Sequence, residues 1–324
     1  MKRSASFWRR WLDMQDRHSA FLGVRFWFAV YSGLAAGLAV VLVSGESIAF
    51  CRTTTCDPSS ADCQVDPETE CPTLGIPLYW PARCVGYSLQ QDATRSVPFD
   101  IFQDISERSF ESWLTADCGS GDTPNMTASN LGSILCDATE YNRYAGNANI
   151  IMFRSDTWPY KSALNTLALT TVTYNRNDGQ IYDVDIEINA TVALTTSLDH
   201  VTYDVESILT HEVGHFFGMA HSNDRSATMF AQYAMGSVSL RSLELDDISG
   251  ICDIYPPSSK TRKCSPLPHG GLKNSCGDSD RPESNNCTCS AIPPQKAPWK
   301  LMPLFSIFAW FAMRRIRGTR LSLS

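Results

Sequence analysis

The sequence has no excess of positive charge, and its first 50 residues contain no cysteine. The 324-residue chain carries a formal net charge of −7 at pH 7, whereas a protein that binds nucleic acid needs a basic face. The composition therefore excludes nucleic acid as the expected partner. Hydrophobic residues make up 43% of the chain, which is enough for one ordinary core with appendages.

All twelve cysteines follow residue 50. An even number of cysteines in the mature part of a chain indicates disulfides formed in an oxidising compartment. No two of them are spaced Cys-x-x-Cys, and this absence disfavours a second metal site, which is the alternative use of so many thiols. The pairing cannot be deduced from sequence, because twelve cysteines allow on the order of ten thousand connectivities.

The segment before the first cysteine is typical of an export signal. Basic residues between Lys2 and Arg25 precede the apolar run 26–43, and Ser47-Ile48-Ala49 offers small residues where a signal peptidase reads them. We predict a signal peptide over 1–49, with an uncleaved membrane anchor as the alternative. Both place the rest of the chain across the membrane, because positive charge stays inside. We therefore expect an exported protein, either secreted or held at the cell surface.

Composition divides the remaining chain into four segments. Residues 50–74 are rich in Cys, Asp, Pro and Thr and predict a cross-linked N-terminal extension; residues 75–256 have the pattern of a folded domain. Residues 257–296 predict a cysteine-containing linker, and residues 297–324 an apolar and then basic sorting or anchor tail. The apolar part of the tail, 301–313, is shorter than the roughly 20 residues of a spanning helix, so a small buried segment is the alternative. Membrane association through either terminal apolar segment is a further expectation.

Periodicity within the folded domain predicts both strands and helices. The expected strands are 84–90, 149–153, 167–175 and 181–189, and the expected helices are 99–115, 203–218 and a last one near 242–252. In the fourth strand Asp183, Asp185 and Glu187 alternate with apolar residues. Alternating acids are more often a solvated face than a metal site, so we expect exposed carboxylates there, with bound calcium as the alternative.

Three of the six histidines fall within HEVGHFFGMAHS, residues 211–222. His211 and His215 are four residues apart, so on a helix they lie on one face and can reach one ion. Gly218 stands where the helix is expected to end, because glycine tolerates the left-handed conformation that turns the chain. That turn lets His221 return as a third ligand. Three imidazoles leave zinc with an open position, which marks a catalytic rather than a structural site.

Glu212 lies next to the first of these histidines. It can stand beside the metal-bound water without ligating the metal. Zinc lowers the pKa of its bound water to about 7, and a carboxylate there would act as general base and then carry the proton to a leaving amine. A lone His-Glu-x-x-His occurs by chance, but the extended HExxHxxGxxH fixes five positions at once. We therefore predict a catalytic zinc site.

The extended motif, followed by Ser222, resembles that of the metzincin zinc peptidases and in particular the matrixin branch. Downstream, SATMF (226–230) places Met229 where these peptidases have the methionine turn beneath the zinc, and LELDDISGICDIY (243–255) resembles the final matrixin helix. The cysteine-rich start and the chain end resemble exported matrixin-family proteins of myxobacteria. The resemblance covers roughly residues 75–256.

This resemblance implies an α+β fold of the zincin or metzincin type, with a twisted mixed β-sheet, an active-site helix and a C-terminal helix. It implies a zinc-dependent endopeptidase that acts on protein or peptide substrates. The substrate would lie antiparallel to an edge strand, here LALTTVTY (167–174), with one side chain in a pocket beside the zinc. The implied roles are zinc ligation by His211, His215 and His221, general base for Glu212, structural support by Met229 and Gly218, and substrate binding by Tyr233.

The chain also departs from the family pattern. The outer pocket wall of matrixins is a Pro-x-Tyr segment, whereas this chain has Ala231-Gln232-Tyr233, which keeps only the tyrosine. No histidine occurs between His18 and His200, so the second, histidine-held zinc of many matrixins is not expected. Cys84, within PARCVG, could mimic a latency cysteine, but it begins the first expected strand, and we predict a disulfide half.

Two rival functions accompany the peptidase hypothesis. A non-catalytic envelope or adhesion module with a peptidase-like fold would be expected to lack a ligand or the glutamate, and this sequence lacks neither. Zinc-dependent hydrolysis of a non-protein amide would use the same residues, so only substrate profiling separates it from peptide hydrolysis.

Overall fold

The structure, a computed structural model, describes residues 50–56, 63–67, 69, 71–163, 165–258 and 264–276. The predicted signal peptide, the C-terminal tail, and Cys287 and Cys289 of the predicted linker lie outside these residues. Within the described part of the chain, no helix is both long enough and apolar enough to cross a membrane.

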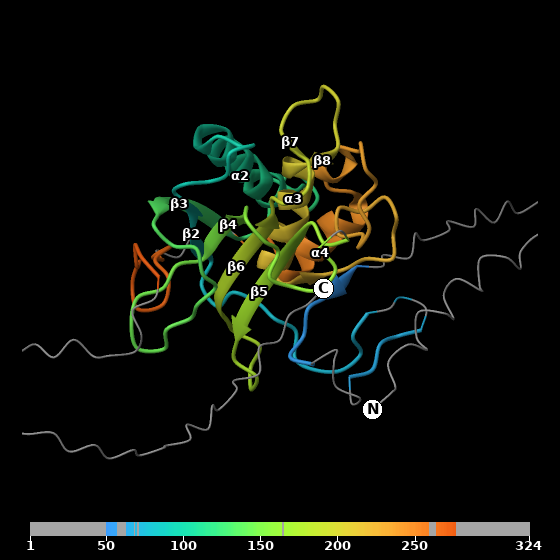
Figure 1. Cartoon of the computed structure of the whole chain (residues 1–324). Helices are drawn as coiled ribbons and strands as arrows, with labels where there is room; N and C mark the ends of the chain where they lie inside the picture. Colours follow the sequence, from blue (N-terminus) through green and yellow to red (C-terminus); the bar gives the residue numbers. More distant parts are fainter. Residues whose placement is uncertain are drawn as a thin grey trace, which may run out of the picture. The chain divides into compact units, whose positions relative to one another are not determined.

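A five-stranded mixed sheet forms the centre of the fold (Figure 1). β2 is parallel to β3 and β4, and β4 is parallel to β6, whereas β5 runs antiparallel to β6 at the end of the sheet. The strands in spatial order are β3 (Thr127–Ile134), β2 (Cys84–Gln90), β4 (Ile150–Arg154), β6 (Ile181–Asn189) and β5 (Ala168–Tyr174). An antiparallel edge strand on an otherwise parallel sheet confirms the predicted α+β class with a mixed sheet.

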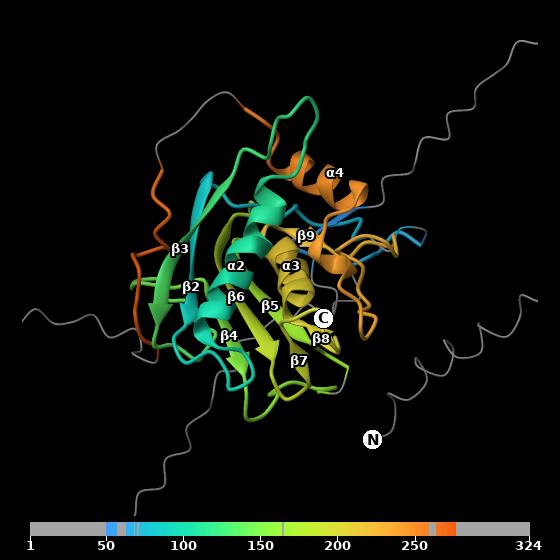
Figure 2. The same ribbon diagram turned by 90° about the horizontal axis from the view of Figure 1, so that it is seen from above.

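Helices α2 (Phe99–Leu114) and α3 (Val205–Phe216) pack together on one face of this sheet (Figure 2). In α2 the buried side recurs at helical spacing through Phe102, Ile105, Phe110 and Trp113. Every residue of α3 except His211 and His215 is buried. The helix that carries the motif is therefore held by the core on almost all sides.

Helix α3 has defined ends. At its start Asp204 caps the helix, because its carboxylate accepts a hydrogen bond from the backbone N–H of Ser207 at 2.9 Å. At its end Gly218 has φ of 95°, a conformation that L side chains rarely adopt. A Cβ there would also lie 2.8 Å from the Leu78 carbonyl oxygen. The chain can therefore reverse immediately after the second histidine.

Short elements complete the domain. The N-terminal strand β1 (Cys51–Arg52) pairs antiparallel with β9 (Met219–Ala220), directly before His221. β7 (Leu194–Thr195) pairs with β8 (Tyr203–Asp204), and the 3₁₀ helix η1 (Ser239–Arg241) precedes α4 (Leu245–Ile254). The N-terminal extension thus adds a strand beside the turn that follows the motif helix.

Five disulfides join ten of the cysteines. Cys84, which we predicted to be a disulfide half, pairs with Cys264, and the segment 264–276 is fixed to the domain at its other end as well. This segment forms bridges to Leu135 and Asn147. The pairs are Cys51–Cys71, Cys56–Cys63, Cys84–Cys264, Cys118–Cys252 and Cys136–Cys276.

The prediction of a solvated acidic face on β6 is wrong. Asp183, Asp185 and Glu187 are 1%, 2% and 0% exposed. Residues of β4 and of loops bind these acids: the backbone N–H groups of Glu140 and Ile150 donate to Asp185, each at 3.1 Å, and Glu187 binds Arg154 and Tyr160. These partners come from distant parts of the chain, which the alternation along the strand does not reveal.

Candidate metal centre

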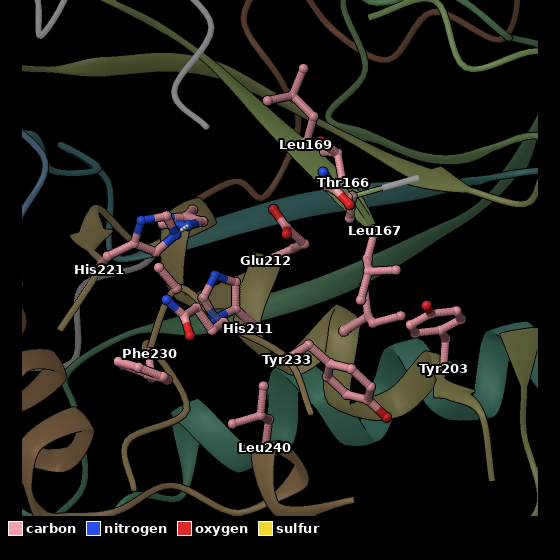
Figure 3. Close-up of a pocket in the computed structure, with 16 residues that line it drawn as sticks. Thr166, Leu167, Leu169, Tyr203, His211, Glu212, His221, Phe230, Tyr233 and Leu240 are labelled. Atoms are coloured by element: carbon pink, nitrogen blue, oxygen red, sulfur yellow. Dashed lines mark hydrogen bonds between the residues drawn. The ribbon is translucent and has the colours of Figure 1, made fainter. Parts of the chain in front are cut away.

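The three histidines of the motif lie close together, and Figure 3 shows His211 and His221 beside each other. One ring nitrogen from each of His211, His215 and His221 lies within 4.8 Å of the other two. The Nε2 atoms of His215 and His221 are 3.2 Å apart. In the part of the chain that the structure describes, this is the only group of three or more His, Cys, Asp or Glu side chains with such spacing.

Backbone carbonyls fix the orientation of two of the rings. The Nδ1 atom of His211 is 2.6 Å from the Thr228 carbonyl oxygen, and that of His215 is 2.9 Å from the Met219 carbonyl oxygen. A carbonyl oxygen only accepts, so Nδ1 carries the hydrogen in both rings and Nε2 keeps its lone pair. Nε2 lone pairs at this spacing, on rings whose Nδ1–H groups are hydrogen-bonded to carbonyl oxygens, suit zinc.

Burial favours the neutral form of two of the imidazoles, those of His215 and His221. It lowers the pKa of His215 well below the usual value, and the neighbouring His221 and His211 add to the effect. It likewise lowers the pKa of His221 to about 3, with His211 again adding to the shift. Neutral imidazole is the form that binds metal. At neutral pH these two rings are therefore ready to ligate without losing a proton.

Glu212 lies between the imidazoles and the strand β5 (Figure 3). Its side chain is largely buried, with the residue 7% exposed. Its Oε2 accepts a hydrogen bond from the Thr170 hydroxyl at 2.5 Å. Burial raises the pKa of Glu212, although the charge of His211 and the Thr170 hydrogen bond act in the opposite direction. Glu212, which the sequence predicts to be the base, thus lies beside the three histidines.

Met229 packs directly beneath the motif helix. It is fully buried, and a Cβ added to Gly214 would overlap its Sδ atom and lie 2.7 Å from Cζ2 of Trp113. The turn that carries Met229 is held by Asp247, whose carboxylate accepts the backbone N–H groups of Thr228 and Met229 at 2.7 and 3.0 Å. The Met229 side chain therefore packs against the helix at Gly214, and Met229 is not among the residues that line the pocket.

Several of these supporting residues were missed by sequence reasoning. Asp247 belongs to the Asp246-Asp247 pair that resembles the matrixin helix, but its hydrogen bonds to the methionine turn were not foreseen. Ser222 likewise donates to Asp246 at 2.6 Å, which ties the residue after the third histidine to α4. Thr170 carried no sequence signal at all, because its role depends on how β5 is placed against α3.

A pocket of about 500 Å³ opens beside the triad. Its walls come from β5, α3 and the segment after Met229, and Tyr233 is among them. The Tyr233 hydroxyl accepts from the backbone N–H of Asp204 at 2.9 Å and donates to the Ser237 carbonyl. Besides the three histidines and Glu212, the lining includes Leu167, Ala168, Leu169, Tyr203, Ile208, Phe230, Ala231, Gln232, Tyr233 and Leu240.

Comparison with known proteins gives a match to one family model and matches to several relatives. Residues 133–256 match the matrixin family model. Metalloendoproteinase 1-MMP from Arabidopsis thaliana is 30% identical over 125 residues, which is 37% of this chain and 30% of that protein. Human matrilysin is 44% identical over 54 residues, 17% of this chain and 20% of its own length. Human neutrophil collagenase is 46% identical over 57 residues, 18% of this chain and 12% of its own length.

The matches are limited in extent. They span no more than 30% of the length of these three relatives. The family-model match nevertheless covers the region that holds β4, β5, β6, α3 and α4, and hence the histidine triad and the methionine turn. Together with the motif, the family-model match makes residues 133–256 of this chain matrixin-like.

Proposed function

We propose that this protein is a zinc-dependent endopeptidase with a metzincin-type fold that hydrolyses peptide bonds. The observation that carries the proposal is the convergence of three imidazole nitrogens beside a buried carboxylate at the mouth of a pocket. His211, His215 and His221 would hold the zinc. No fourth His, Cys, Asp or Glu of the described residues joins that group. Three protein ligands are typical of catalytic zinc, whereas structural zinc usually has four.

The chain's own residues account for the proton transfers. Bound zinc would act as a Lewis acid and lower the pKa of water at the site. Glu212 takes the proton of the water that adds to the carbonyl carbon of the scissile bond, and then gives it to the nitrogen as the C–N bond breaks. The products are a carboxylic acid and an amine, so one water is consumed per bond cleaved.

Substrate binding follows from the edge strand. β5 is the last strand in the sheet, and Leu167, Ala168 and Leu169 border the pocket. An extended peptide can therefore add to β5 through backbone hydrogen bonds. Its side chain on the amine side of the scissile bond would enter the pocket, with Tyr233 in the wall. The substrates are accordingly proteins or peptides that offer an extended segment.

Export is the second part of the proposal. Five disulfides within the described residues favour an oxidising compartment, and the sequence of 1–49 favours a signal peptide. We infer a secreted or surface-attached enzyme. Calcium at the acids of β6 stays an alternative, although Asp185 and Glu187 already have partners within the protein.

The test compares Glu212→Gln with the wild type on casein and on a peptide library. Glu111→Gln is the matched control, since Glu111 is exposed on α2, outside the pocket lining. We expect Glu212→Gln to keep its zinc and to lose kcat by a factor of about 10²–10⁴, and the control to match the wild type. Chelation should abolish activity, and added zinc should restore it. A zinc-loaded wild type that cleaves nothing would instead support the rival function, a non-catalytic envelope or adhesion module.

A further inference from the structure

A hydroxyl group on the edge strand lies within hydrogen-bond distance of the motif helix. Thr170 is 4% exposed, and its Oγ1 lies 2.5 Å from Oε2 of Glu212 and 3.4 Å from the Glu212 carbonyl oxygen. A hydroxyl has a single hydrogen to donate. The carboxylate oxygen is closer and charged, so the hydrogen goes to Oε2.

The position of this hydroxyl is set by the sheet. Thr170 pairs with Ile186 on β6, so its backbone is fixed by the ladder of hydrogen bonds. Threonine is also β-branched, which restricts its first side-chain torsion. The donor is therefore rigid, whereas the terminal torsion of a glutamate is intrinsically broad.

This hydrogen bond leaves the two oxygens of Glu212 with different surroundings. Oε2 is held from the strand side, and Glu212 still contributes to the pocket lining. The oxygen that is not bonded to Thr170 is thus the one available to a water molecule beside the histidines. We propose that Thr170 is a positioning residue, which orients the carboxylate of Glu212 for proton transfer. This inference rests on the proposed peptidase function.

The same strand would then serve two purposes. Leu167, Ala168 and Leu169 border the pocket, and Thr170 follows them on β5. A peptide that adds to this edge is held by the element that also holds the base. The distance between the scissile bond and the carboxylate is accordingly set within one rigid unit, which is how proximity lowers a barrier.

The test replaces the hydroxyl without changing the shape of the side chain. Thr170→Val should lower kcat about tenfold and leave KM within about twofold, because the lost contact aligns the base and does not bind substrate. Thr170→Ser keeps the hydroxyl and should recover most of the loss. Thr171→Val is the matched control, since successive side chains on a strand face opposite sides. Zinc content and Tm should show that all variants are folded and loaded.

Crystal structures of the zinc-loaded wild type and Thr170→Val provide a readout that does not depend on turnover. We expect the Glu212 carboxylate to leave its wild-type orientation in the variant. The positioning role would be overturned if the wild type is active and Thr170→Val has the same kcat. It would also be overturned if the Glu212 carboxylate keeps its orientation in the variant. Loss of kcat that Thr170→Ser does not recover would overturn it as well. An inactive wild type would instead contradict the proposed function, and the crystal structures would still decide the role of Thr170.

Discussion

Substitution of Gly214 by alanine tests how closely the motif helix packs on the methionine turn. Gly214 faces Met229 and Trp113, and an added Cβ would overlap the Met229 sulfur and lie 2.7 Å from Trp113 Cζ2. Trp113 cannot retreat easily, because its Nε1 donates to the Thr210 carbonyl at 2.8 Å and its side chain is fully buried. The displacement must therefore fall largely on Met229.

Two opposing contributions set the expected magnitude. Overpacking of a core typically costs about 1–3 kcal/mol. Replacing glycine by alanine within a helix gains about 1 kcal/mol. The net change in the free energy of unfolding for Gly214→Ala is therefore a loss of about 0–2 kcal/mol. Met229→Ala alone leaves a cavity under the helix and should lose about 2–5 kcal/mol.

The two substitutions should couple. In the Met229→Ala background the overlap with the sulfur is removed and the close approach to Trp113 remains, so Gly214→Ala should cost less there than in the wild type, by up to about 2 kcal/mol. The destabilisation by Gly214→Ala should thus be smaller in the Met229→Ala background than in the wild type. A double-mutant cycle by urea unfolding with intact disulfides measures this coupling. An equal effect of Gly214→Ala in both backgrounds would refute the packing account.

Three further predictions concern other parts of the molecule. Burial, and after it the charges of Asp185 and Glu140, raise the pKa of Asp183 well above its usual value. The native state therefore binds this proton more tightly than the unfolded state, and the free energy of unfolding should fall as pH rises from about 3.9 through the raised pKa. The Tm of Asp183→Asn should fall less between pH 4 and pH 8 than that of the wild type, and an equal fall would contradict this. Removing the Cys118–Cys252 disulfide, whose partners are 134 residues apart, should cost about 2–5 kcal/mol, and an unchanged urea midpoint would argue against the bond. Arg241→Met should lower the free energy of unfolding by about 3 kcal/mol, because it leaves the fully buried carboxylate of Asp204 without its cationic partner. The same substitution should raise KM more than it lowers kcat, because the adjacent Leu240 lines the pocket. The reverse kinetic pattern would show that η1 does not shape substrate binding.

The sequence predicted the elements whose periodicity is strong. The strand 181–189 agrees with β6 residue for residue, and the helix expected at 99–115 ends one residue earlier, at Leu114. β3 was not predicted, because TASNLGSI contains a glycine and polar residues and lies half-exposed at the sheet edge. An edge strand with little buried surface leaves little apolar pattern to detect.

Features that depend on distant contacts were beyond sequence reasoning. The spacing of the motif brought His211 and His215 to one helix face, but nothing local indicated that Thr170 would reach Glu212 from β5. Likewise, alternation along β6 cannot show that Glu140 and Tyr160 cover its acids. The disulfide pairing needed coordinates for the same reason, since each partner is chosen by proximity in the fold.

The most direct test of the central claim is anomalous diffraction at the zinc absorption edge from crystals of the zinc-loaded protein. We predict one peak at about 2.0–2.1 Å from a ring nitrogen of each of His211, His215 and His221, with no further protein ligand and with Glu212 beside it. A peak elsewhere, no peak at the triad, or a fourth protein ligand closing the site would contradict the assignment of a catalytic zinc centre.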